Sequence, residues 1–311
     1  MANITASMVK DLREMTGAGM MDCKKALAET NGDMDAAVEY LRKNGQAKAE
    51  KKAGRIAAEG MVATVLGADD KSAAIVEVNS ETDFVAKNDE FRSFVADVAN
   101  QALNTNAADI DAFLAEAWAA DTAKTVKEAL VEKVAVIGEN LSIRRFEKVT
   151  VDNGCVVSYI HGGGRIGVLV EAETSVVNDD VKAALKNVAM QIAAMRPQYV
   201  SQAEVSEEYK NHEREILAEQ IKNDPKMAGK PEKVIAGAVE GRLSKQLKEV
   251  CLLDQVYVVN SDLTVAQYVK EVSKEVGAEI TVKKFVRFET GEGLEKKEEN
   301  FAEEVAKQMG Q

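Results

Sequence analysis

One pattern occurs twice along this chain and constrains its fold more than any other feature. Around residues 60–102, two segments with alternating apolar residues are joined by Gly67–Asp70 and followed by a loop and a helix-spaced stripe. The same order returns at 155–196, where Gly162–Gly164 joins the strand-like segments and Val181–Met195 carries the helical stripe. The repetition predicts an α+β core of two related halves with antiparallel sheets.

The first part of the chain has a helical period instead. Ile4, Met8 and Leu12 recur every four residues, and breaks follow at Thr16–Gly19 and Asn31–Asp33. The spacing predicts a three-helix bundle whose third helix is short, over Asp35–Leu41. Residues 43–55 are charged and rich in Ala and Lys, which predicts a linker helix and a domain boundary near Gly54.

The region after Pro197 predicts a projecting antiparallel pair of helices, a coiled-coil hairpin, over Ser206–Lys222 and Glu232–Val250. Further predictions are helices over Asp109–Ala119, Thr122–Val136, the residues after Thr264 and Glu292–Gln311, and strands over Val256–Val259 and Ile280–Phe288. The chain is thereby divided into an N-terminal helical docking domain with linker at 1–54, a core N-half at 55–149, a first part of the core C-half at 150–200, a helical hairpin at 201–254, the completion of the C-half at 255–290, and a C-terminal helical module at 291–311.

Composition narrows the class of protein. The 311 residues carry 40 Lys and Arg against 52 Asp and Glu, a net charge of −12, which argues against direct binding of nucleic acid. The 3 cysteines and 2 histidines lack the spacing of a zinc site, so we expect no metal site and a reducing compartment. No apolar run reaches transmembrane length and no signal core is present, so we expect a cytoplasmic protein without membrane contact.

Two enzyme-like motifs fail on their context. Gly162–Gly167 matches G-x-G-x-x-G, but a strand-like segment follows it where a dinucleotide site needs a helix. His161–Gly164 is similar to the oxyanion loop of some esterases, but the chain has no G-x-S-x-G nucleophile elbow. A P-loop is absent as well. We therefore expect no cofactor, no catalytic residue and no covalent chemistry by this chain.

The segment Thr82–Val85 allows two interpretations. Thr82 and Asp83 are typical of a turn or a helix N-cap, whereas Phe84 and Val85 are bulky apolar residues in a predicted loop. Physics alone favours a Phe84 that fills the core. The alternative is an acidic and aromatic probe, presented on a rigid platform for insertion into a partner.

Longer motifs resemble one known family over the whole chain, bacterial elongation factor Ts, the nucleotide exchange factor of elongation factor Tu. The two most specific are Leu12–Leu27 and Glu77–Lys87. Shorter matches, in order, are Ile137–Asn140, His161–Gly162 with Arg165–Leu169, Glu240–Arg242, Cys251–Leu253 and Arg287–Gly293.

The resemblance implies roles for particular residues. The N-terminal unit would be similar to ubiquitin-associated bundles and dock on the partner's nucleotide-binding domain through Met20 and Met21, of which we expect one to be buried in the bundle. Thr82, Asp83, Phe84 and Val85 would disturb the partner's Mg²⁺ site and release GDP. His161 and Gly162 would lie at a second contact edge.

The implied partner is elongation factor Tu, in its GDP-bound and nucleotide-free forms. A homodimer or a 2:2 complex could form through the helical hairpin, where the turn Asn223–Pro231 departs from the family pattern. The alternative function is a non-catalytic adaptor or holdase, which would bind a partner through the N-terminal bundle and the hairpin without accelerating nucleotide release.

Overall fold

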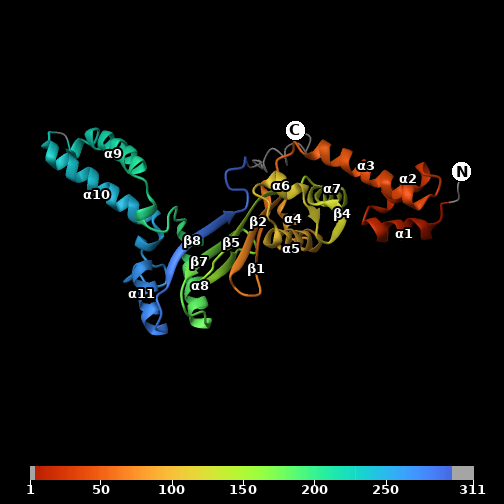
Figure 1. The fold of residues 1–311 in the computed structure, drawn as a ribbon. Coiled ribbons are helices and arrows are strands. Elements are labelled where there is room, and N and C mark those ends of the chain that lie inside the picture. Colours follow the sequence, from red (N-terminus) through yellow and green to blue (C-terminus); the bar gives the residue numbers. More distant parts are fainter. Residues whose placement is uncertain (1–3, 228, 296–311) are drawn as a thin grey trace.

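Two three-stranded antiparallel sheets form the centre of this mixed α+β protein (Figure 1). A computed structural model describes residues 4–227 and 229–295. The first sheet has the order β1-β2-β5, with strands Glu59–Leu66, Ser72–Ser80 and Ser142–Thr150. The second has the order β6-β7-β8, with strands Gly154–His161, Ile166–Glu173 and Thr281–Glu289.

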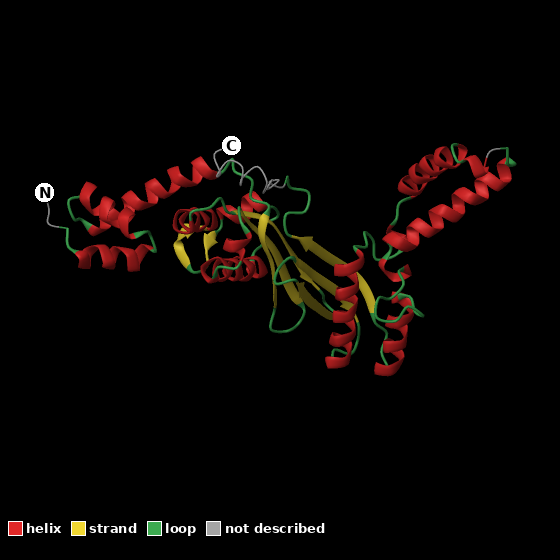
Figure 2. Ribbon diagram, turned by 180° about the vertical axis from the view of Figure 1, so that it is seen from behind, coloured by secondary structure: helices red, strands yellow, loops and turns green. Residues whose placement is uncertain are grey.

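The two sheets pack against each other through one face each, and helices cover their other faces (Figure 2). On the first sheet lie α4, Asp83–Ala86, α5, Asp89–Asn104, α6, Ile110–Ala115, and α7, Val126–Ile137, with a small ribbon of β3, Ala117–Trp118, and β4, Asp121–Thr125. On the second sheet lie α8, Asp179–Met195, and α11, Val265–Val276.

The halves use the same local signals to begin and end their helices. Asparagine side chains cap α5 and α8, at Asn88 and Asn178. Thr125 and Thr264 form capping boxes at α7 and α11, and both of these helices end at a left-handed glycine. In each half, the third strand of the sheet follows the helix with the capping box: β5 follows α7, and β8 follows α11. This third strand pairs with the second strand, β2 or β7, which lies in the middle of the sheet.

Helical units stand at the two ends of the molecule (Figure 1). The N-terminal one consists of α1, Ala6–Thr16, α2, Met20–Glu29, and α3, Met34–Lys52, around a small core that includes Leu12, Cys23 and Leu27. The long α3 runs back to the centre and packs on α7.

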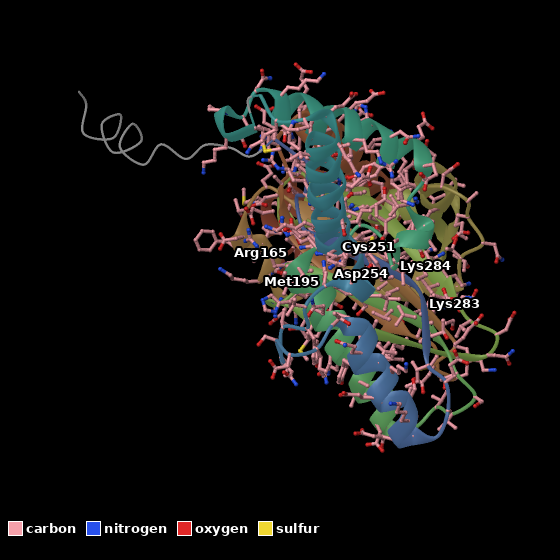
Figure 3. The ribbon with its side chains drawn as sticks, turned by 90° about the vertical axis from the view of Figure 1, so that its left-hand side faces the viewer. Arg165, Met195, Cys251, Asp254, Lys283 and Lys284 are labelled. Atoms are coloured by element: carbon pink, nitrogen blue, oxygen red, sulfur yellow. The ribbon has the colours of Figure 1, made fainter. Side chains whose placement is uncertain are left out.

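At the opposite end, α9, Glu207–Lys222, and α10, Glu232–Val250, form an antiparallel hairpin with its own apolar seam. Short 3₁₀ turns flank the hairpin at Gln202–Glu204 and Leu252–Asp254, and a third, Pro225–Met227, lies between its two helices. Seen from this end, Cys251 and Asp254 lie near the middle of the view, at the base of the hairpin, with Arg165 and Lys283 toward opposite sides (Figure 3). In the described ranges, no helix combines the length and the apolar character needed to cross a membrane.

A buried carboxylate joins the sheets at one end. Glu77 of β2 is fully buried and accepts hydrogen bonds from Arg144 Nη1 at 3.0 Å and Arg145 Nε at 2.6 Å. It also accepts from the backbone N–H of Gly291, just beyond β8, at 2.8 Å. Arg145 in turn stacks over the ring of Phe288, 4.2 Å from its centroid. The charge of Glu77 therefore holds the end of the second sheet against the first.

Several elements differ from the sequence-based predictions. The short third helix Asp35–Leu41 and the linker helix are one continuous helix, α3. The helix expected over Asp109–Ala119 stops at Ala115, and the one expected from Thr122 begins at Val126, because the β3–β4 ribbon intervenes and buries Trp118 against Phe94.

One strand prediction was wrong, and one strand was not predicted. Val256–Val259 is not a strand; Val256 makes a single bridge to Thr264, and Gln191 of α8 hydrogen-bonds the backbone of Val256 and Val258. The strand β5 was missed altogether. Residues 292–295 form a turn and a bend and no helix, so the predicted helix Glu292–Gln311 does not start there, and its remainder lies outside the described residues.

We expect Glu77→Ala to lower the free energy of unfolding by about 3–5 kcal/mol, because it leaves Arg144 and Arg145 without their shared partner. Urea denaturation would measure the loss. The control is Glu90→Ala, which removes an exposed ion pair to Lys133 and should cost less than about 1 kcal/mol. Equally small losses in both variants would contradict the role assigned to Glu77.

Candidate partner-contact surface

The segment after β2 forms a single helical turn, α4, that presents Phe84 to solvent. Thr82 is its N-cap, and the Thr82 hydroxyl accepts a hydrogen bond from the N–H of Val85. The side chain of Phe84 is 80 % exposed, whereas Val85 packs against the apolar cluster beneath the first sheet. The hypothesis that Phe84 fills the core is therefore wrong. Val85 fills that place, and the ring is free to contact another molecule.

The acid beside the ring is already paired. The Asp83 carboxylate accepts a hydrogen bond from Lys87 Nζ at 2.6 Å, one helical turn away, and this contact holds the pKa of Asp83 below its usual value. Lys87 Nζ also stands 6.0 Å from the centroid of the Phe84 ring. The exposed face of α4 is thus an aromatic ring bordered by an ion pair.

The backbone that leads into α4 is held by a side chain from another part of the chain. Glu139, directly after the C-cap of α7, accepts from the backbone N–H groups of Glu81 and Thr82, each at 3.0 Å, and from the Thr82 hydroxyl at 2.7 Å. The Phe84 turn is therefore fixed at its base while its tip is exposed.

Methionines surround the turn between α1 and α2. Met20 is 59 % exposed and Met21 is 74 % exposed, so the expectation that one of them is buried was wrong. The bundle core is filled by residues further along α2, and the first residues of the helix project beyond it. Met15, at the end of α1, is 63 % exposed and adds a third flexible apolar side chain that sequence reasoning missed.

His161 and Gly162 lie where the sequence predicted, at the end of β6 and in the glycine turn that leads to β7. His161 is exposed, and its Nδ1 is 2.9 Å from the hydroxyl of Tyr159. The strand β7 follows the turn, where a dinucleotide site would need a helix N-terminus, so the dinucleotide interpretation of the G-x-G-x-x-G match does not hold.

Strand β1 contacts both the Phe84 turn and the glycine turn at Gly162–Gly164. The carbonyl of Gly164 accepts from the N–H of Val62 at 2.7 Å, and α4 packs against the same strand. The C-half surface near the turn also carries exposed Ile160 and Met195, which the sequence analysis did not select; Met195 and Arg165 lie on the same side in Figure 3.

The exposed methionines Met15, Met20 and Met21 lie on the N-terminal bundle, which borders the N-half of the core. A Cβ added at Gly17, in the α1–α2 turn, would lie 3.7 Å from Val136 near the end of α7. Glu139 follows three residues later, so the methionines and the Phe84 turn approach the C-terminal end of the same helix.

The described residues offer little for covalent chemistry. All three cysteines are buried as free thiols, and burial raises their pKa values, that of Cys251 to about 11. Within residues 4–227 and 229–295, no three His, Cys, Asp or Glu side chains gather closely enough to hold a metal ion. The outward groups are aromatic, thioether and aliphatic, which is the chemistry of a surface that binds another protein.

Comparison with known proteins identifies the family. The family model described as elongation factor TS matches residues 81–292. Elongation factor Ts of Clostridium tetani is 56 % identical over 98 % of this chain and 99 % of its own length. Elongation factor Ts of Clostridioides difficile is 57 % identical over 99 % of this chain and 100 % of its own length.

These matches identify a protein of translation. The chain belongs to the elongation factor Ts family. It is a translation elongation factor, and the role of its family is nucleotide exchange on elongation factor Tu, a non-catalytic role.

The glycine turn makes a prediction about packing. A Cβ at Gly164, where φ is 106°, would lie 2.9 Å from Met61 Cβ and 3.2 Å from the carbonyl oxygen of Val62. At Gly163, where φ is 65°, it would meet nothing within 4 Å. We expect Gly163→Ala to cost about 1 kcal/mol of stability for its left-handed backbone, and Gly164→Ala at least about 1 kcal/mol more for the clash. Equal losses in thermal unfolding would contradict this close approach.

Proposed function

We propose that the Phe84 turn enters elongation factor Tu beside its bound GDP and shifts the groups that hold the Mg²⁺ ion. The observation that carries this proposal is an 80 % exposed phenylalanine on a turn whose base is tied down. Burying an exposed ring of this size in a partner is favourable. Because the base of the turn is held in place, we infer that the partner's groups move to accommodate the ring.

The consequence for the nucleotide follows from charge. Mg²⁺ bridges the nucleotide phosphates to a GTPase and neutralises part of their charge. Displacing its ligands weakens the hold on the phosphates, and GDP leaves. Thr82 and Val85 support the ring in this account, and Asp83 offers a carboxylate to polar groups near the ion once its contact with Lys87 opens.

The other surfaces supply affinity. We infer that the α1–α2 turn docks Met20 and Met21 on the nucleotide-binding domain, in a bundle similar to ubiquitin-associated domains that occupies residues 1–54 with its linker. His161 and Gly162 form a second contact from the C-half. Binding of nucleotide and of this factor then oppose each other reciprocally, because a coupling free energy is the same in both directions.

The chain after the N-terminal unit divides into further units. We propose units at 55–149, 150–200 with 255–290, the hairpin at 201–254 and a C-terminal module at 291–311. The hairpin exposes Ile216 and Val234, which suit a contact between two copies of the chain, alone or in a 2:2 complex with the partner. The proposed complex acts in the cytoplasm, without direct nucleic acid or membrane contact.

We expect Phe84→Ala to slow factor-stimulated GDP release by at least about tenfold, because a buried anchor contributes about 2 kcal/mol or more and about 1.4 kcal/mol is a factor of ten. Release of a fluorescent GDP analogue from elongation factor Tu measures the rate. His161→Ala should have a smaller effect, as expected for a contact at the rim. Leu66→Ala, at the far end of β1, is the control and should exchange at the parent rate.

A parent-like rate for Phe84→Ala would contradict the proposed mechanism. Binding of elongation factor Tu without any acceleration of release by the parent chain would favour the adaptor or holdase function instead.

The methionines should affect affinity more than rate. We expect replacement of both Met20 and Met21 by Ala to raise the half-saturating factor concentration by about fivefold or more, because two side chains buried on docking are truncated. The rate at saturation should change by less than about twofold, since interactions that serve only binding leave the rate of the bound complex intact. A fall in the saturated rate with unchanged half-saturation would show that the methionines act on release itself.

A further inference from the structure

Two loops of the N-half hold each other's backbone beside the Phe84 turn. Glu139 accepts the three hydrogen bonds from Glu81 and Thr82 described above. In return, the Glu81 carboxylate accepts from the backbone N–H of Asn140 at 2.6 Å. The segment that leads from β2 into α4 and the segment that leads from α7 into β5 are therefore joined by reciprocal contacts.

The linker after α3 is tied into the same place. Arg55 Nη1 lies 3.4 Å from the carboxylate of Glu81, and the Asn140 side chain donates to the carbonyl of Arg55 at 2.8 Å. Lys52 Nζ donates to the carbonyl of Gly138. Three segments, from the linker, the end of β2 and the end of α7, thus meet around the carboxylates of Glu81 and Glu139.

The helical turn needs such a support. α4 has four residues, and a single turn fixes several backbone dihedrals for very few hydrogen bonds, so it is unstable alone. Phe84 adds no packing, because it is exposed, and Val85 is the side chain of the turn that packs against the core. The Thr82 hydroxyl, which accepts from Val85 N–H, is oriented by its own bond to Glu139. The direction of the ring therefore depends on a half-buried carboxylate that lies 55 residues later in the chain.

We propose that Glu139 is a positioning residue for nucleotide exchange, which holds the Phe84 turn in the orientation that enters the partner. This inference rests on the proposed function of Phe84. Glu139 acts through the backbone of Glu81 and Thr82, so its contribution to exchange exists only while the ring is present.

The test combines a measurement on the free protein with a double-mutant cycle on exchange. Glu139→Gln keeps the size of the side chain but replaces one of the two accepting oxygens by a donor, which then faces N–H or O–H donors. Glu90→Gln is the matched control, an exposed carboxylate paired with Lys133. Amide hydrogen exchange at Glu81 and Thr82 is measured without partner, and GDP release at saturating factor is measured with and without Phe84→Ala.

We expect Glu139→Gln to speed amide exchange at both positions by about tenfold and to slow saturated GDP release by about fivefold or more, since hydrogen bonds to a charged acceptor are the strong ones. The half-saturating concentration should change by less than about twofold. With Phe84→Ala present, Glu139→Gln should cause no further loss. Glu90→Gln should leave both measurements at the parent values.

If Phe84→Ala is slow, the proposed function stands, and three results for Glu139→Gln would overturn this inference alone. The first is unchanged amide exchange at Glu81 and Thr82, and the second is faster amide exchange with a parent-like rate of GDP release. The third is that Glu139→Gln slows GDP release as much in the Phe84→Ala background as in the parent. A parent-like rate for Phe84→Ala would overturn the proposed function, and this inference with it.

If Glu139→Gln fails to fold, Glu139→Asp gives a second test, because aspartate keeps the charge but its shorter side chain withdraws the carboxylate from the N–H groups of Glu81 and Thr82. Amide exchange at both positions should again be faster, and saturated GDP release slower, than in the parent. Parent-like amide exchange, or faster amide exchange with parent-like GDP release, would overturn the inference.

Discussion

The close approach of the two sheets is the constraint on which the other parts of the molecule depend. At Gly167 of β7 an added Cβ would lie 2.4 Å from Val62 of β1, so the sheets meet at a distance that only glycine allows at this point. Ile75 and Leu169 are fully buried in the same seam. The two surfaces of the core that are proposed to contact the partner, the Phe84 turn and the glycine turn, both pack against β1. The packing of the two sheets therefore sets their relative position.

A large exposed ring has to be held by something other than its own burial. In this protein that support comes from polar contacts between segments distant in sequence: Glu139 binds the backbone of Glu81 and Thr82, and Glu81 binds the backbone of Asn140. These contacts leave Phe84 exposed in the free protein, and its burial free energy then becomes available when a partner binds. The contacts that hold the turn in the free protein are therefore also the ones on which the proposed displacement of the partner's groups depends.

The sequence predicts most local elements because their signals are local. The strands β1, β2, β6 and β7 alternate or join at glycine turns, and α5, α8, α9 and α10 have clear caps or stripes. β5 was missed because Arg144 and Arg145 interrupt its apolar pattern, and their partner Glu77 lies 67 and 68 residues earlier. The β-branched run at Val256–Val259 looks like a strand, but Gln191 holds it as an extended segment beside α8. For the site, hydropathy placed Phe84 in the core; its outward direction depends on the long-range contact of Glu139 with Thr82.

Phe84 is proposed to act on the partner's magnesium site, and the magnesium dependence of its effect on GDP release tests this most directly. GDP release from elongation factor Tu would be followed with the parent chain and with Phe84→Ala, each in saturating Mg²⁺ and after chelation of the ion. If the ring works by displacing groups that hold Mg²⁺, the difference between the two chains should be large with the ion and nearly absent without it. A difference of the same size under both conditions would contradict the account.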